Sequence, residues 1–270
     1  MSRWVVGWFE RSAEASPWEF EGRIKGSMNK LFAPFAVCCF MIMNVAHADN
    51  QNTDNSLTFN VAALSDYRAR GISQTHLDPA LQAGADFVNI PTGIYAGTWL
   101  STIKWVEDQG GTDNIEWDFY AGKRGHIITN LSYDVGVMVY TYPRNDLRAN
   151  ANSTEIYGQL GYGPTYAKYS YSVGNLFGFA NSRGSGYLDV GANIKAAFGT
   201  TLNLHAGQQA IANSSSANYV DWKIGISKNF GFATGALAVI GANTNYYVGP
   251  APDFVNLAKT ELIVTFSKVF

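Results

Sequence analysis

Beyond residue 48 the chain is built almost throughout from segments in which apolar and polar side chains alternate with a period of two; residues 188–195, LDVGANIK, are one example. Successive side chains of a β-strand point to opposite faces, so this pattern predicts strands with one apolar and one polar face. No stretch in this part approaches 18 consecutive apolar residues, which excludes a membrane-spanning helix there. The pattern therefore predicts an all-β protein.

The alternation predicts about twelve strands. They cover residues 57–72, 80–88, 93–104, 114–123, 128–142, 153–162, 164–172, 186–198, 200–209, 218–228, 231–242 and 259–270. Every odd connection between them has 7 to 16 residues, and every even one has 1 to 4. An antiparallel barrel that crosses an outer membrane has short periplasmic turns and long extracellular loops, whereas a soluble sandwich has no reason to alternate in this way. We therefore predict an antiparallel transmembrane β-barrel.

Charge is scarce and confined mainly to one face of the strands. Only 15% of the chain is charged, against about a quarter in soluble domains. Residues 49–270 contain 14 Lys and Arg and 17 Asp and Glu, a net charge of 14 − 17 = −3, so nothing favours binding to nucleic acid. The alternative, a soluble sandwich or lipocalin-like barrel, would normally place more Lys and Glu on its polar faces.

The polar faces define the candidate lumen and constriction residues. Nine are acids (Asp66, Asp86, Glu116, Asp118, Asp134, Glu155, Asp189, Asp221 and Glu261) and five are bases (Arg68, Arg70, Lys168, Lys195 and Lys223). The balance of 5 − 9 = −4 predicts a mild cation preference that salt weakens. Five tyrosines occupy positions on the same polar faces as these charged residues and would narrow the lumen: Tyr120, Tyr140, Tyr157, Tyr166 and Tyr187.

Residues 28–48 have the features of a secretory signal peptide. A lysine precedes an apolar run without charge, and the run ends in the small-x-small sequence Ala46-His47-Ala48. A transmembrane helix is disfavoured by the short length and by Pro34. Residues 1–27 lack any targeting character, so we expect translation to start at Met28 and this extension to be non-native or mis-assigned. Cleavage after Ala48 would leave residues 49–270 as the mature barrel.

Asp66, Arg68 and Arg70 form the most concentrated group of charges. On a strand running from 57 to 72, their spacing of two places them on the lumen face, stacked towards the extracellular end. Two interpretations remain open. The group is either a constriction that contacts solutes, or a structural ion-pair cluster with Asp86 or Glu261 on neighbouring strands. Gly71 is expected to permit a bend or bulge.

Several segments resemble the TorF-type porins of Gram-negative bacteria. The most specific is Ser65–Thr75, SDYRARGISQT; weaker matches are Ile94–Trp99, Leu131–Gly136 and Asp221–Lys228. The resemblance spans residues 57–270. It implies a porin-like barrel of the outer membrane, and it supplies no substrate.

The C-terminal strand ends in Phe270, which is similar to the C-terminal signal that the barrel-assembly machinery recognises in outer-membrane proteins. Leu262, Val264 and Phe266 continue the signal, and Lys268 departs from it. Assembly machinery and outer-membrane lipid are therefore the expected partners.

Catalytic motifs are missing. The His residues form no HxH or HxxxH pair and residues 49–270 contain no Cys, so we expect no metal site and no cofactor. A membrane lipase is disfavoured because no GxSxG segment exists and His205 has inward parity. The sequence favours a non-enzymatic outer-membrane channel for passive diffusion of small hydrophilic solutes. The alternative is a non-conducting barrel with a structural or surface-interaction role.

Overall fold

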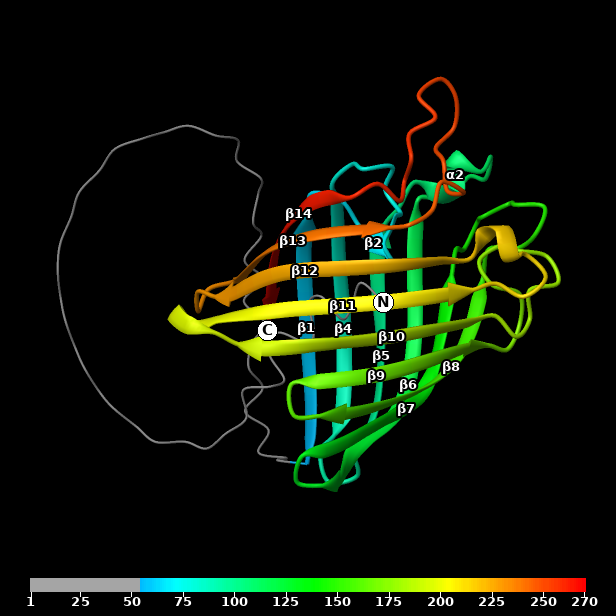
Figure 1. The fold of residues 1–270 in the computed structure, drawn as a ribbon. Helices are drawn as coiled ribbons and strands as arrows, with labels where there is room; N and C mark the ends of the chain where they lie inside the picture. Colours follow the sequence, from blue (N-terminus) through cyan, green and yellow to red (C-terminus); the bar gives the residue numbers. More distant parts are fainter. Residues whose placement is uncertain (1–53) are drawn as a thin grey trace, which may run out of the picture.

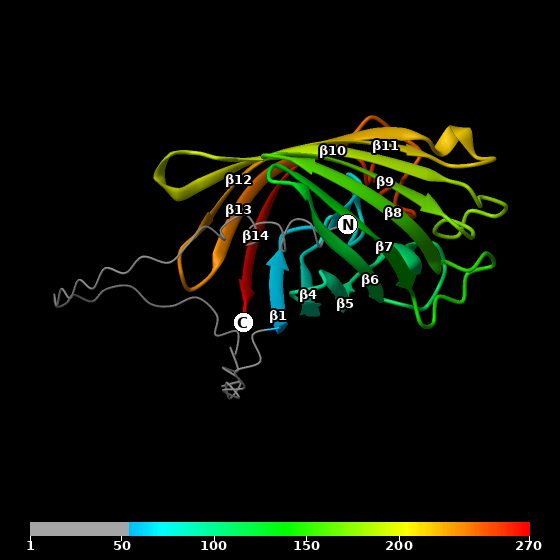
Figure 2. The same cartoon turned by 90° about the horizontal axis from the view of Figure 1, so that it is seen from below.

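In the computed structural model, which describes residues 54–270, twelve strands form one closed antiparallel barrel (Figure 1). The wall strands are β1 (Asn55–Leu64), β4 (Ala80–Asn89), β5 (Ile94–Thr102), β6 (Ile115–Ile128), β7 (Leu131–Thr141), β8 (Ser153–Tyr162), β9 (Thr165–Ser172), β10 (Gly186–Lys195), β11 (Thr200–Ala210), β12 (Tyr219–Asn229), β13 (Thr234–Ala242) and β14 (Glu261–Val269). Each wall strand pairs with the next along the chain, and β14 returns to pair with β1 (Figure 2). The predicted extension 1–27 and signal peptide 28–48 lie outside the described residues.

The connections alternate in length as predicted. Those at one end of the barrel, the short-turn end, include residues 129–130 and 163–164; those at the other, the long-loop end, include 173–185 and 243–260. Three short helical elements lie in the connections: α2 (Trp105–Asp108) and the two 3-10 turns Ala197–Gly199 and Ser215–Ala217. Among residues 54–270 no helix has the length and apolarity to cross a membrane.

The outer surface of the wall is apolar. Leu57, Ile156, Ile224, Leu262 and Phe266 are each more than half exposed. Aromatic side chains lie near both ends of this surface, with Trp117 and Tyr171 towards the long loops and Tyr162, Phe230 and Phe270 towards the short turns. An apolar band between aromatic girdles is the outer surface of a transmembrane barrel.

Inside the barrel, tyrosine rings lie over glycines of adjacent strands. A Cβ atom at Gly97 would lie 2.1 Å from the hydroxyl oxygen of Tyr120, and one at Gly122 would lie 2.4 Å from that of Tyr95. A larger residue at either glycine would displace the ring. The same contact recurs at Gly136 with Tyr157, Gly191 with Tyr166 and Gly207 with Tyr187.

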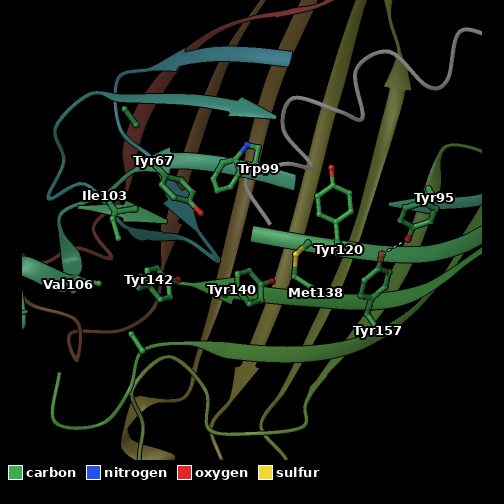
Figure 3. Packing of buried hydrophobic residues seen from close by; sticks show 12 residues of the cluster. Tyr67, Tyr95, Trp99, Ile103, Val106, Tyr120, Met138, Tyr140, Tyr142 and Tyr157 are labelled. Carbon is green, nitrogen blue, oxygen red and sulfur yellow. Dashed lines mark hydrogen bonds between the residues drawn. The ribbon is translucent and has the colours of Figure 1, made fainter. Parts of the chain in front are cut away.

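The predicted inward tyrosines are found in the lumen. Tyr120, Tyr140, Tyr157 and Tyr187 are buried, and Tyr166 is half-buried. Figure 3 shows several of these rings in one cluster, where the hydroxyls of Tyr95 and Tyr157 are hydrogen-bonded. Bulky side chains therefore fill part of the lumen.

One predicted strand is wrong in its extent. The segment 57–72 does not continue up the wall, because β1 ends at Leu64 and the chain then turns into the lumen. There β2 (Arg68–Ala69) and β3 (Ile72–Ser73) form a separate two-stranded hairpin before the chain returns to the wall at β4. We call residues 65–79 the lumen hairpin.

Phe270 ends the seam that closes the barrel. Its backbone N–H donates to the Phe59 carbonyl at 2.8 Å, and its carbonyl accepts from the Phe59 N–H at 3.2 Å. Its ring lies on the exposed side of the wall. Its role as an assembly signal stays a prediction.

The lipid-facing surface yields a first prediction. Ile224 lies in the middle of β12 and Ile90 in the turn after β4, and their exposures are nearly equal at 59% and 58%. Replacing Ile224 by Lys should destabilise the barrel by about 2–4 kcal/mol in a bilayer, and replacing Ile90 by Lys by about 0–1 kcal/mol. Denaturant unfolding in lipid vesicles measures both. Equal losses in the two variants would contradict a membrane-embedded wall.

Candidate functional site

The lumen hairpin turns tightly at Arg70 and Gly71. Arg68 pairs with Ser73 and Ala69 with Ile72, so Arg70 and Gly71 alone form the turn. Their φ angles are +49° and +79°. A two-residue hairpin turn with both φ angles positive is a type I′ turn, in which glycine relieves strain at the second position. The flexibility predicted at Gly71 is therefore used for a hairpin turn and not for a bulge.

The base of the lumen hairpin is fastened near the seam. The Arg68 guanidinium pairs with the Asp66 carboxylate at 2.5 Å and also donates to the Leu257 and Lys259 carbonyls, each at 3.0 Å. The Ser73 hydroxyl donates to the same carboxylate at 2.6 Å. These bonds attach the hairpin to the connection between β13 and β14.

The tip of the lumen hairpin reaches the far wall. Arg70 Nη2 donates to both Glu155 carboxylate oxygens at 2.7 Å, and Nη1 donates to the Gln209 side chain. Its guanidinium also lies over the Tyr187 ring, 4.4 Å from the ring centre. Glu155 lies on β8, five strands round the wall from β1 in one direction, and Gln209 lies on β11, four strands round in the other. The hairpin therefore crosses the lumen.

Gly71 packs against the wall between these anchors. A Cβ atom at this position would lie 2.6 Å from the Asp221 Cβ atom and 2.9 Å from the Gly241 carbonyl oxygen. Asp221 lies on β12 and Gly241 on β13. Only a glycine allows the turn to approach these strands so closely.

The structure brings the three charged residues of the predicted group together, but on the lumen hairpin and with other partners than those predicted. Asp66, Arg68 and Arg70 are buried in the lumen hairpin and are not stacked along a wall strand. The partners also differ from those predicted, because Arg68 pairs with Asp66 and Arg70 with Glu155.

The predicted partners have other contacts. Asp86 accepts a hydrogen bond from Tyr120 at 2.7 Å, and Glu261 pairs with Lys259 at 2.7 Å at the exposed rim.

Most other predicted lumen residues also face inward. Glu116, Asp118, Glu155, Lys168, Asp189 and Asp221 are buried; Asp134, Lys223 and Glu261 are half-buried; Lys195 is exposed at the short-turn end. Many carboxylates accept from tyrosine hydroxyls. Tyr67 donates to Glu116 at 2.8 Å, and Tyr187 donates to Asp221 at 2.8 Å. Buried charge requires such partners, and tyrosine supplies them without a second charge.

His205 lies in the lumen, as its parity predicts. Its Nδ1 is 2.9 Å from Asp189 and its Nε2 is 2.6 Å from Asp221. The three residues come from adjacent strands β10, β11 and β12. The alternation predicts that each of the three side chains faces the lumen. It does not by itself predict that they lie side by side, because that depends on how the three strands are paired.

A cavity of about 490 Å³ lies at the long-loop end, above the lumen hairpin. Its lining includes Tyr67 and Arg70 of the hairpin, Trp105 of α2, Phe177 and Tyr247. We call this space the vestibule. Sequence reasoning missed it because many of its lining residues lie on connections, where side chains follow no period.

One tyrosine of the vestibule ties two long loops together. The Tyr247 hydroxyl donates to the Ala217 carbonyl at 3.0 Å. Burial, together with the neighbouring Tyr246, raises the pKa of Tyr247 above its usual value. The hydroxyl therefore stays protonated and remains a donor at neutral pH.

The pair of Arg70 and Glu155 yields a second prediction. Both side chains are at least 97% buried, so replacing Arg70 by Ala leaves a buried carboxylate without its cation and should cost about 3–5 kcal/mol of unfolding free energy. Replacing Glu155 by Ala as well should recover part of this loss. Replacing Lys259 by Ala, which breaks an exposed pair, should cost about 0–1 kcal/mol. Chemical unfolding of the refolded variants measures all three; equal stability of Arg70→Ala and wild type would contradict the anchoring role.

The model of Gcw_chp, described as a bacterial protein of unknown function, matches residues 48–270. No curated protein matches the sequence.

Among solved structures, the KdgM porin in complex with disordered oligogalacturonate has a TM-score of 0.50 at 6% identity, covering 79% of this chain and 98% of that one. Outer membrane phospholipase A from Escherichia coli has a TM-score of 0.43 at 13% identity, with 83% and 93% covered. OccK5 of Pseudomonas aeruginosa has a TM-score of 0.38 at 13% identity, with 81% and 67% covered. The similarity to KdgM supports the porin fold. By its family match, the chain belongs to Gcw_chp, a bacterial family of unknown function.

Proposed function

We propose that this chain is a porin-like channel of the outer membrane, through which small hydrophilic solutes diffuse passively, and that the lumen hairpin forms its narrowest point. The observation that carries the proposal is the hairpin itself, which crosses a charged lumen and is fastened at Arg68 on one side and Arg70 on the other. Opposed charges at such a point set the local field that a passing solute meets. That the chain is related to the TorF-type porins in particular remains a prediction from the sequence motifs.

The two faces of the wall support a channel rather than a filled core. The outer face is apolar, while the inner face carries carboxylates, ammonium groups and tyrosine hydroxyls. A barrel of twelve strands lies between small barrels filled by side chains and large barrels with open channels. The strand number is therefore compatible with a narrow pore.

The alternative is a non-conducting barrel with a structural or surface-interaction role. The burial of the lumen hairpin and its anchoring on opposite walls favour this function, because the same contacts would make a permanent plug. An enzymatic role has less support. His205 faces the lumen, where two carboxylates hold it, and not the lipid on which a membrane lipase acts.

The proposed location yields a third prediction. With residues 28–48 acting as a signal peptide, the protein should fractionate with the outer membrane and migrate at different positions in boiled and unboiled samples. Removal of Phe270 should lower the amount of folded barrel because the seam loses its last two backbone bonds. Recovery of the intact protein in the soluble periplasm would contradict the proposal.

Gly71 yields a fourth prediction, on conductance. In planar bilayers the Gly71→Ala variant should conduct more than wild type, because the added Cβ forces the hairpin away from Asp221 and Gly241. Gly231→Ala is the matched control. Gly231 has a similar φ of +86° but nothing lies within 4 Å of its added Cβ, so its conductance should stay at the wild-type level.

Each outcome of this experiment is informative. Equal currents through all three proteins would remove the hairpin from the role of constriction. Absence of current in every protein, each shown to be folded by its heat-dependent mobility, would reject the channel in favour of the non-conducting barrel.

A further inference from the structure

We propose that the vestibule is a binding site for short uncharged saccharides, which it holds above the constriction; this inference rests on the proposed channel function and names a solute class for it. The vestibule has a volume of about 490 Å³, which lies within the range of roughly 300–1,000 Å³ found for small-molecule sites. Its walls come from five connections of the long-loop end and from β6, β7, β11 and β12, and the lumen hairpin forms its floor. A solute arriving from the long-loop side would meet this space before the hairpin.

Aromatic rings dominate the lining. Six of them are Tyr67, Trp105, Tyr142, Phe177, Tyr246 and Tyr247. Two pairs stand edge to face, Trp105 with Tyr142 at 4.9 Å and Tyr246 with Tyr247 at 5.2 Å between ring centres. The face of an aromatic ring carries partial negative charge, so it attracts the weakly positive C–H groups on the face of a sugar ring.

Polar groups among the rings favour a ligand rich in hydroxyls over an apolar one. The indole N–H of Trp105 has no hydrogen-bond partner among residues 54–270, although buried indole N–H groups usually have one. Gln74 and Gln109 also line the space, and the third glutamine of the lining, Gln209, is already bound to Arg70 and to the Gly186 carbonyl. An apolar ligand would leave the Trp105 N–H and the amide of Gln109 unpaired, at a cost in binding free energy, whereas sugar hydroxyls both donate and accept.

The charges of the vestibule favour a neutral ligand. Arg70 is bound to Glu155, and Glu116 accepts from the Tyr67 and Tyr142 hydroxyls at 2.8 and 3.1 Å. The remaining charged lining residue, Arg148, is exposed, where an ion pair with a ligand is worth little. An ionic ligand would therefore lose hydration without gaining a buried counter-charge.

The position of the site links it to the channel. Tyr67 and Arg70 belong both to the vestibule lining and to the hairpin that crosses the lumen. A saccharide on this floor would lie directly over the constriction. Binding should therefore reduce the ion current in addition to producing a binding signal.

Maltotriose is the probe for the test, with the full-length protein folded in phosphocholine micelles, since sugar-based detergents would compete. We expect saturable binding by calorimetry, with an affinity in the millimolar range. Trp105→Ala should weaken binding at least tenfold, and Trp105→Phe, which keeps a ring but removes the N–H, should weaken it by less. Trp117→Ala is the matched control, because Trp117 lies on the outer face of β6, and it should bind as wild type does.

Several results would overturn the inference. They are no saturable maltotriose binding to folded wild type, equal weakening in the Trp105 and Trp117 variants, or tighter binding of trigalacturonate than of maltotriose, which would show selection for an acid. Conductance of the same preparation without sugar separates the two proposals. Current without maltotriose binding would reject the saccharide site alone, and binding without current would reject the channel while leaving the site in place.

Discussion

The structure depends on one constraint, which is that every backbone N–H and C=O group in hydrocarbon must have a partner within the protein. The wall meets it by pairing each strand with its neighbours and by closing β14 onto β1, where Asn60 is opposite Val269 and Leu64 opposite Thr265. Closure in turn assigns one face of every strand to lipid and the other to the lumen. The two-residue alternation in the sequence is the direct consequence, and so is the alternation of short and long connections, because antiparallel neighbours must turn at opposite ends.

The same constraint, applied to side chains, organises the lumen. Carboxylates that face inward lose part of their water, so they are paired with donors: Glu155 with Arg70, Asp221 with His205 and Tyr187. Tyrosine suits this place because its ring fills space over a glycine while its hydroxyl donates to an acid. Tyr120 shows both contacts, with its hydroxyl against the Gly97 backbone and 2.7 Å from Asp86. Glycine, tyrosine and inward acids therefore occur together because the tyrosine ring packs over the glycine while its hydroxyl donates to the acid.

The sequence was sufficient to predict the wall, because period-two alternation is local and each strand shows it independently. The number of strands and the alternating connections are confirmed, and residues such as Glu116 and Asp221 are buried inside the barrel. The lumen hairpin was missed because Asp66, Arg68 and Arg70 continue the same alternation past Leu64, where the chain leaves the wall. Their direction is decided by contacts with Leu257 and Glu155, which are distant in sequence. The vestibule was missed for a related reason, since Trp105 lies on the four-residue helix α2 and Tyr247 on a long loop, and neither segment carries a period-two signal.

The wall and the lumen hairpin consequently depend on different interactions. The wall is a continuous ladder in which no strand can leave without exposing backbone groups to lipid. The hairpin contributes no strand to that ladder. Its two short strands form a separate sheet, and it is fastened to the rest of the barrel by side-chain bonds of Arg68 and Arg70 and by the backbone bond from the Ser73 N–H to the Leu257 carbonyl. Its displacement would therefore break a small set of buried polar contacts and leave the seam between β1 and β14 intact. For this reason the closure of the wall and the anchoring of the lumen hairpin rest on separate sets of interactions, and the second set involves the 15 residues between β1 and β4.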